Sequence, residues 1–259
     1  LKSTGINRLS IGVQSFHDED LKFMNRSHDG NMARKSIAIA KKLGFKNITI
    51  DLIYGLPNLS NKKWEANLNI VKQLKINHFS AYALTVEPKT KLDYLIKNKK
   101  LDPISDEKIE EHFKILQESS ERIGFVQYEI SNFCKNNVIS KHNSSYWKKK
   151  KYIGIGPSAH SFNGNSRQWN IKSNSKYVLK LKSQQEYYEI EKLSENEKYN
   201  EYVLTTLRTM WGINQKYLTK NYNKKINLKF TSLIKKWIES GDVIKENENF
   251  KLSKKGMLM

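Results

Sequence analysis

Hydrophobic and polar positions follow two alternating periods over the first hundred residues. Runs rich in β-branched and aromatic residues predict strands at residues 8–16, 47–54 and 78–86. Helical spacing predicts helices at residues 18–25 and 31–43, and a further helix after a cap at Ser60. Strands that alternate with helices are typical of parallel βα units, so an α/β fold is expected. Residues 47–54 are mostly apolar, which predicts a strand covered on both faces.

The pattern changes after residue 100. A helix is predicted at residues 106–123, capped by Ser105, and a strand at 125–130. From residue 131 to 166 the periodicity stops, and this segment, dense in His, Asn, Gly and aromatic residues, is expected to be irregular and functional. In the tail, helices at 199–210 and 228–240 precede a hairpin at 242–252. That order predicts a small winged-helix-like domain.

Composition narrows the class of protein. The single cysteine, Cys134, excludes a disulfide framework and favours a reducing, cytoplasmic location. No apolar run approaches the roughly 18 residues that cross a bilayer, so membrane contact is expected only at the periphery. The formal charge is +20, yet only 6 of the 46 basic residues are Arg, and the Lys are spread along the chain. We therefore expect no nucleic acid partner, whereas anionic membrane surfaces and acidic proteins suit this charge.

The ends of the predicted parallel strands are where ligands are expected, because the βα loops of a barrel converge there. Asp51 is the sharpest candidate, since a carboxylate in an apolar strand needs a ligand, a fixed donor or a charged partner. Arg26 is a candidate partner and is otherwise a surface residue. An Asp held by a backbone amide or an Arg is the structural alternative. The strand-end residues are Gln14, Asp51, Tyr54, Thr85 and Glu87.

Three blocks of sequence carry a resemblance to a known family. Residues 5–16 (GINRLSIGVQSF), 51–57 (DLIYGLP) and 128–133 (YEISNF) resemble successive blocks of the oxygen-independent coproporphyrinogen oxidase group of radical S-adenosylmethionine (SAM) proteins. The resemblance implies that residues 1–100 form strands four to six of a partial (β/α)6 barrel. It further implies barrel-capping segments at 101–170 and a winged-helix-like domain at 171–259. The chain opens at Leu1 without Met, and we expect the three cysteines of a 4Fe-4S cluster to lie upstream.

The family's SAM contacts fall on particular residues of this chain. Asp51 is expected to accept hydrogen bonds from ribose hydroxyls or to pair with the ligand's ammonium group, and Arg26 to grip its carboxylate. Thr85 stands where some relatives carry a smaller residue. The implied SAM contacts are Gln14, Arg26, Asp51 and Thr85, with a further contact near Ala159 and His160.

A second motif points to heme. Residues 142–147 (HNSSYW) match the HNxxYW pattern of the HemW-type heme chaperones, although a His in a polar loop is on its own usually a surface residue. The resemblance implies that His142 binds heme iron and that Tyr146 and Trp147 offer flat faces to the porphyrin. Asn143 would fix the tautomer of the imidazole. Cys134 is either a second, thiolate ligand or a small buried apolar residue.

The segment 154–161 (GIGPSAHS) resembles a family block that folds over the barrel mouth, and it lacks the context of a dinucleotide fingerprint. The other four histidines, at 17, 28, 78 and 112, are expected to be structural or at the surface.

Three functions compete. The first is a heme chaperone that binds heme, SAM and, in the full-length protein, a 4Fe-4S cluster, and that delivers heme to a membrane-associated or respiratory acceptor. The second is an oxygen-independent coproporphyrinogen III oxidase, which the HNxxYW motif disfavours. The third is a barrel fragment with a winged-helix tail that only mediates protein contacts. Whether the chain forms a homodimer is left open.

Overall fold

A computed structural model describes all residues, 1–259, and divides the chain into two compact units. The first unit comprises Leu1–Ile139 and the second Ser140–Met257, with Leu258 grouped with the first and Met259 with the second. The expected α/β class is confirmed. The three-part division at residues 100 and 170 stays a prediction, as does the count of six strands in the barrel.

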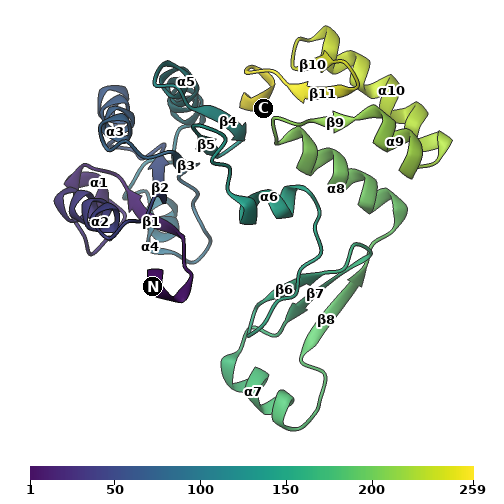
Figure 1. The fold of residues 1–259 in the computed structure, drawn as a ribbon, viewed down its shortest axis with the longest axis horizontal. Coiled ribbons are helices and arrows are strands. Elements are labelled where there is room, and N and C mark those ends of the chain that lie inside the picture. Colours follow the sequence, from purple (N-terminus) through teal and green to yellow (C-terminus); the bar gives the residue numbers. More distant parts are fainter. The chain divides into compact units, whose positions relative to one another are not determined.

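The first unit is a mixed sheet of five strands in the order β1-β2-β3-β5-β4 (Figure 1). The three strands predicted as parallel are parallel, and the last two run antiparallel to their neighbours. The strands are β1 (Arg8–Gln14), β2 (Asn47–Tyr54), β3 (His78–Ala83), β4 (Val126–Glu129) and β5 (Asn132–Cys134). The helices are α1 (Asp18–Phe23), α2 (Gly30–Lys42), α3 (Asn61–Gln73), α4 (Lys91–Lys97) and α5 (Asp106–Arg122), with a short 3-10 turn at Lys2–Thr4.

Both predicted helix caps are confirmed. The Ser60 hydroxyl accepts a hydrogen bond from the backbone N–H of Lys63, and that of Ser105 from the N–H of Lys108. Each hydroxyl satisfies a donor that the first turn of the helix leaves without a partner, which fixes where α3 and α5 begin.

The two faces of the sheet in the first unit differ in chemistry. Alternate residues of β2, from Ile48 to Tyr54, are buried, and the Tyr54 ring lies 5.6 Å from that of Trp64 on α3 and 6.4 Å from that of Phe113 on α5. Asn47, Thr49, Asp51 and Ile53 alternate with them on the opposite face, where Thr49 is buried and the other three are half-buried. No residue of β2 is exposed, which agrees with the expectation of a strand covered on both faces, although three of the residues on the face opposite the helices are polar.

The second unit begins with α6 and a small antiparallel sheet in the order β6-β7-β8. The segment expected to be irregular contains some regular structure, since β5, α6, β6 and the start of β7 lie within residues 131–166, but most of its residues lie outside helices and strands. The elements are α6 (Lys141–Trp147), β6 (His160–Phe162), β7 (Ser166–Asn170), α7 (Asn174–Lys182) and β8 (Tyr188–Lys192).

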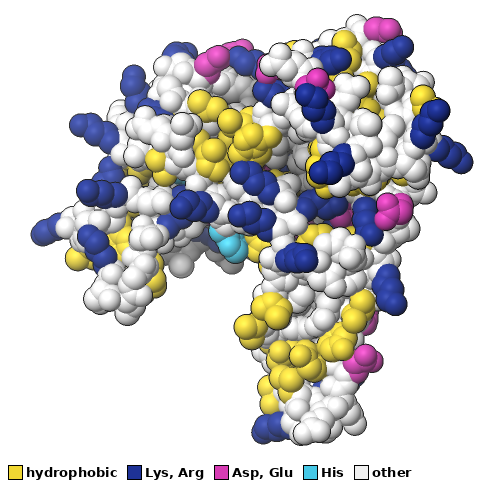
Figure 2. Space-filling view, turned by 45° about the vertical axis from the view of Figure 1, so that its right-hand side comes forward, with side chains coloured by type: hydrophobic (Ala, Val, Ile, Leu, Met, Phe, Trp, Pro, Cys, Tyr) yellow, Lys and Arg dark blue, Asp and Glu magenta, His cyan; other side chains and the backbone are white.

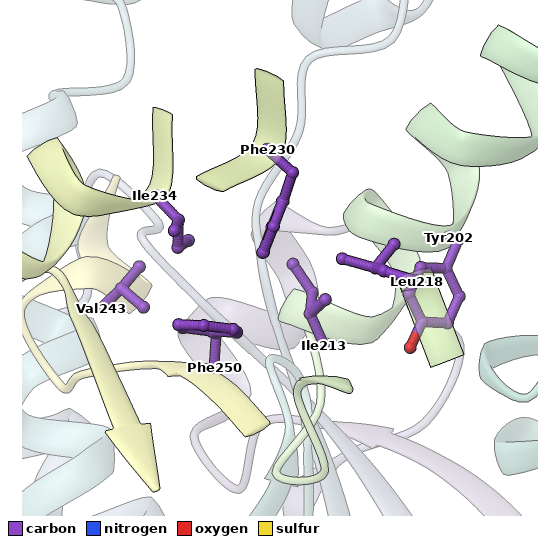
Figure 3. Packing of buried hydrophobic residues seen from close by; sticks show 7 residues of the cluster. All are labelled: Tyr202, Ile213, Leu218, Phe230, Ile234, Val243 and Phe250. Carbon is purple, nitrogen blue, oxygen red and sulfur yellow. The ribbon is translucent and has the colours of Figure 1, made fainter. Parts of the chain in front are cut away.

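The C-terminal elements form the helices and hairpin that the sequence predicts, together with a short helix and a short strand that it does not. An apolar cluster, which includes Tyr202, Phe230 and Phe250, joins the helices to a three-stranded sheet in the order β10-β11-β9 (Figure 3). The elements are α8 (Glu195–Leu207), β9 (Ile213–Asn214), α9 (Gln215–Asn221), α10 (Lys224–Glu239), β10 (Val243–Glu246), β11 (Asn249–Leu252) and a 3-10 turn at Gly256–Leu258. No helix in either unit is both long and apolar enough to span a bilayer.

Candidate functional site

Asp51 lies in the middle of the polar face of the first unit. It is on β2, in register with Ser80 of β3, and its carboxylate accepts a long hydrogen bond of 3.4 Å from the Ser10 hydroxyl of β1. The side chain is half-buried, and this loss of hydration raises its pKa. The nearby hydroxyls of Ser80 and Ser10, together with the positive charge of Arg8, oppose that rise. The carboxylate thus retains the capacity to accept further hydrogen bonds from a ligand.

Arg8, rather than Arg26, is the guanidinium that acts on Asp51. Its two terminal nitrogens donate to Asn47 Oδ1, at 2.7 Å, and to Thr49 Oγ1 on β2. Arg26 is exposed, and no hydrogen bond or ion pair joins its side chain to Asp51. The interpretation of Asp51 as one half of an Asp51–Arg26 pair is therefore wrong, and the Arg26 guanidinium is left available to a ligand.

Arg26 is nevertheless held close to the end of β1. It lies in the loop between α1 and α2, where its backbone N–H donates to Leu21 O of α1, and two residues later His28 Nε2 donates to Val13 O at 3.1 Å. Val13 directly precedes Gln14, the last residue of β1. The loop that carries Arg26 is therefore fastened next to one of the other expected SAM contacts.

Gln14 ends β1 in an unusual conformation. The register of β1 with β2 shifts between Ile11 and Gln14, and Gln14 has a φ of 67°, in the left-handed region. A Cβ on Gly12 would lie 2.8 Å from Gln14 Nε2, so the missing side chain at residue 12 gives the amide its place. Ten other residues besides the glycines have a positive φ, so this conformation sets the direction of the Gln14 side chain but does not by itself mark a ligand site.

The remaining strand-end candidates differ in whether their side chains are exposed or buried. Thr85 is exposed two residues beyond β3, and its hydroxyl donates to Ala83 O at 3.4 Å. Glu87 is exposed in the same loop. Tyr54 points into the apolar core beneath α3, where burial raises its pKa to about 12. Tyr54 is thus a packing residue rather than part of a ligand-facing surface.

Buried polar side chains that the sequence did not single out continue the polar face across the sheet. The Ser80 hydroxyl donates to Asn132 Oδ1 at 2.9 Å, and the Asn132 amide donates to the Glu129 carboxylate. On the same face His78 Nε2 lies 2.8 Å from the Tyr128 hydroxyl. In the sequence, the alternation of Asn, Thr and Asp along residues 47–51 was the signal from which this polar face could have been predicted. Its partners on other strands depend on register, which the sequence does not display.

The first unit fits SAM better than a metal cluster. A half-buried carboxylate with weak donors on β2, a glutamine amide at the end of β1 and a free guanidinium in the loop beyond α1 suit a ligand with hydroxyl, ammonium and carboxylate groups. No group of three or more His, Cys, Asp or Glu is placed to hold a metal ion. Cys134 is buried in β5, and burial raises the pKa of its thiol, which suits the structural interpretation.

In the second unit α6 brings His142 and Tyr146 together on one exposed face. Their rings meet edge to face, with centroids 5.1 Å apart, and the Tyr146 hydroxyl lies 3.2 Å from His142 Nε2. Tyr146 in turn lies 5.1 Å from Tyr152, which lies 6.2 Å from Phe162. This aromatic chain, His142–Tyr146–Tyr152–Phe162, leads from the candidate iron ligand towards the small sheet. The backbone N–H of Asn143 donates to the Ser140 hydroxyl, which caps α6. The polar group next to the His142 imidazole is the Tyr146 hydroxyl, in place of the expected Asn143 amide.

Trp147 lies elsewhere. Its ring carries the Arg208 guanidinium at 5.5 Å and lines a cavity of about 180 Å³ with Tyr202 of α8 and Trp211. The structure therefore brings two of the three expected heme residues together, while the third packs against the winged-helix-like part of the same unit.

The glycine segment is a loop that rests on the small sheet. A Cβ on Gly154 would lie 2.1 Å from His160 O, and Gly156 has a φ of 101°, so both positions need glycine. The buried Asn170 amide holds the loop by donating to Gly156 O at 2.9 Å. His160 begins β6 and lies 6.4 Å from the Trp169 ring. It belongs to the second unit, whereas the other expected SAM contacts belong to the first.

Comparisons with known proteins agree with this architecture. Residues 1–71 match the model of the Radical SAM superfamily. The chain is 33% identical over 260 residues to "Heme chaperone HemW" of Bacillus subtilis, covering 100% of this chain and 69% of that protein. It is 30% identical to the HemW of Lactococcus lactis, covering 90% of this chain and 60% of that protein. The solved structure of coproporphyrinogen III oxidase (HemN) from Escherichia coli, a radical SAM enzyme, superimposes with a TM-score of 0.78 at 22% identity, covering 99% of this chain and 63% of that one.

These likenesses define the class in two steps. The E. coli enzyme shares the fold, and the superfamily match marks the parallel βα units of the first unit as those of a radical SAM protein, a class that uses SAM and a 4Fe-4S cluster. The identity to the Bacillus protein over the whole chain narrows the assignment to one family: the chain belongs to the HemW family. It spans about two thirds of the length of that relative and less of the others named.

Proposed function

We propose that the full-length protein is a heme chaperone, which binds heme in its second unit and passes it to an acceptor protein. The observation that carries this proposal is the exposed pair of His142 and Tyr146 on α6. A neutral imidazole is an ordinary axial ligand of heme iron, and an exposed one can release the heme to a competing ligand. Relatives named heme chaperones match the chain at 33% and 30% identity.

Within this proposal the first unit binds SAM through Gln14, Arg26, Asp51 and Thr85, with His160 as a further contact. The ligands of the 4Fe-4S cluster lie outside this chain, because its one cysteine is buried in β5. When bound, the cluster would supply the electron for reductive cleavage of SAM, and residues of this chain would position the SAM. We further propose a cytoplasmic location with peripheral membrane contact, and a membrane-associated or respiratory acceptor.

The test is a titration of the full-length protein with ferric heme, followed by its Soret absorption. Replacing His142 with Ala is expected to shift the Soret maximum and weaken heme binding by about tenfold or more, because an axial bond to iron is lost. Lys141→Ala, on the same exposed turn of α6, is the matched control and should titrate like the wild type. An unchanged spectrum and affinity in His142→Ala would contradict the ligand assignment.

Oxygen-independent coproporphyrinogen III oxidase activity is the second candidate, favoured by the fold shared with the E. coli enzyme. Anaerobic incubation of the reconstituted full-length protein with SAM, a reductant and coproporphyrinogen III separates the two. Formation of protoporphyrinogen at catalytic turnover would replace the chaperone proposal with the enzymatic one.

A further inference from the structure

One face of the small sheet in the second unit forms an open groove that none of the expected site residues occupies. It has a volume of about 470 Å³ and is lined by four tyrosines, at positions 152, 177, 187 and 188, with Ile153 and Ile155 at its rim. These isoleucines are 82% and 87% exposed, an unusual position for large apolar side chains. Figure 2 shows hydrophobic side chains gathered on this part of the chain, over β6–β8 and α7.

The strand register shows which side chains share the groove face. Ser161, Gln168 and Ile190 are neighbours across β6, β7 and β8, so they point to the same side. Ser166 and Lys192 form the next pair on that side. The groove face therefore carries the Ser161 hydroxyl and the Gln168 amide among its apolar side chains, and the Lys192 ammonium lies on the same side of the sheet beside Ser166.

Acidic side chains of β8 are turned away from the groove. Glu189 and Glu191 alternate with the groove residues and lie on the opposite face, where the Trp169 indole donates to Glu189 at 2.9 Å. None of the residues that line the groove is acidic, and Lys192 has no acidic partner. Lys151 lies beside the turn between β6 and β7, next to the groove residue Asn163. The groove thus suits a planar apolar ligand with negative charges at one edge.

The groove is continuous with the candidate iron ligand. Tyr152 lines the groove and also belongs to the aromatic chain that leads from His142 through Tyr146. Both the groove and α6 lie within the second unit. A ligand that stacks on Tyr152 at the edge of the groove therefore also contacts the aromatic chain that leads to His142.

We propose that this groove seats the porphyrin of heme, with tyrosine faces against the macrocycle and Lys192 paired with a propionate, while His142 approaches the iron from the Tyr152 end. The inference rests on the proposed heme function and adds the surface that recognises the ring itself. A volume of about 470 Å³ is in the range of small-molecule sites, and aromatic faces are suited to a macrocycle.

Iron-free protoporphyrin IX separates ring recognition from iron ligation. In the full-length protein, the double variant Ile153→Ser and Ile155→Ser is expected to weaken binding of protoporphyrin IX, measured by its fluorescence, by about tenfold or more. Both side chains are exposed, so folding is retained. Leu228→Ser on α10, 62% exposed in the wild type, is the matched control and should bind normally. His142→Ala should bind protoporphyrin IX like the wild type while its heme spectrum changes.

Charge reversal tests the propionate contact. Lys192→Glu is expected to weaken protoporphyrin IX binding severalfold while leaving its dimethyl ester unaffected, because only the free acid carries the charges. Lys224→Glu at the start of α10 makes the same change of charge away from the groove and should have no effect. Wild-type binding of protoporphyrin IX by the Ile and Lys192 variants would overturn the groove assignment, whatever the result for His142. Loss of binding to phosphatidylglycerol vesicles with porphyrin binding intact would instead identify a membrane contact and overturn it. If the wild type binds neither porphyrin nor heme, the proposed function itself fails.

Discussion

At the scale of single residues, Asp51 shows how a ligand-facing group differs from a structural one. A structural carboxylate in a sheet is usually saturated by short hydrogen bonds or an ion pair. Asp51 has one long hydrogen bond from Ser10, a stabilising hydroxyl at Ser80 and the charge of Arg8, which is already bonded to β2. Its raised pKa means that the ionised form is less stable in the folded chain than in the unfolded one.

Asp51→Asn should therefore separate stability from binding. A raised folded pKa contributes stability that is present below the ordinary pKa of Asp and lost as pH rises through the folded value, so at pH 7 the ionised side chain is a cost. The amide should leave Tm unchanged or raise it by about 1 to 2 °C, since half-exposure weakens the effect. SAM affinity of the full-length protein, measured by calorimetry, should fall by about tenfold or more.

The matched control for that variant is Asp102→Asn, an exposed carboxylate in the loop before α5. It should change neither Tm nor SAM affinity. A fall in Tm of several degrees with normal SAM binding in Asp51→Asn would instead support the structural interpretation of Asp51.

At the scale of elements, α6 has two different sides. His142 and Tyr146 form its exposed side, whereas Trp147 packs under Arg208 and beside Trp211. A helix of seven residues is too short to be stable without tertiary packing. Trp147 therefore positions α6, and with it His142, through contacts with the winged-helix-like part.

Trp147→Ala should reveal this positioning role. The cavity and the lost cation–π contact are expected to destabilise the second unit by about 2 kcal/mol, which lowers its Tm by roughly 8 °C. Trp147→Phe keeps an aromatic ring and should lose about half as much. The Soret maximum of bound heme should be the same in Trp147→Phe as in the wild type. A shifted maximum with unchanged Tm would mean that Trp147 contacts the porphyrin directly.

The sequence predicted some elements better than others, for physical reasons. The bounds of β2 and the caps at Ser60 and Ser105 were visible because they depend on local pattern. Helix α6 was not predicted because Asn and Ser are poor helix formers, although Ser140 can be recognised in the sequence as a helix cap. Strands β6 to β8 are stabilised by pairing between distant residues, and the contact of Arg8 with Asn47 depends on register in the same way.

At the scale of the whole molecule, the two units bury different titratable groups. The buried histidines, His78 and His112, both lie in the first unit. Burial and the charge of Arg8 lower the pKa of His78 to about 3, and burial and the charge of Lys108 lower that of His112 to about 4. His112 is neutral there, with its Nδ1 accepting from the Gly55 N–H, and so has a packing role. The second unit exposes His142 and His160.

This difference predicts that acid destabilises the first unit selectively. A histidine whose folded pKa is lowered contributes stability that is present above its unfolded pKa, near about 6.5, and lost as pH falls below it, because only the unfolded chain takes up the proton. For His78 the loss at pH 5 is about 2 kcal/mol. In the second unit the buried Asp242 has a lowered pKa, which matters only below the ordinary range of Asp. Calorimetry between pH 7.5 and 5 should therefore show one transition that moves to lower temperature and one that moves little.

Variants assign the two transitions. His78→Gln should flatten the pH dependence of the first transition, His142→Gln should alter neither, and Trp147→Ala should move only the second. The net charge becomes more positive in acid, and the added repulsion weakens both units to some degree. The test is therefore the difference between the pH shifts of the two transition temperatures. Equal shifts of both transitions, unaffected by His78→Gln, would show that general charge repulsion, rather than the buried histidines, controls the acid response.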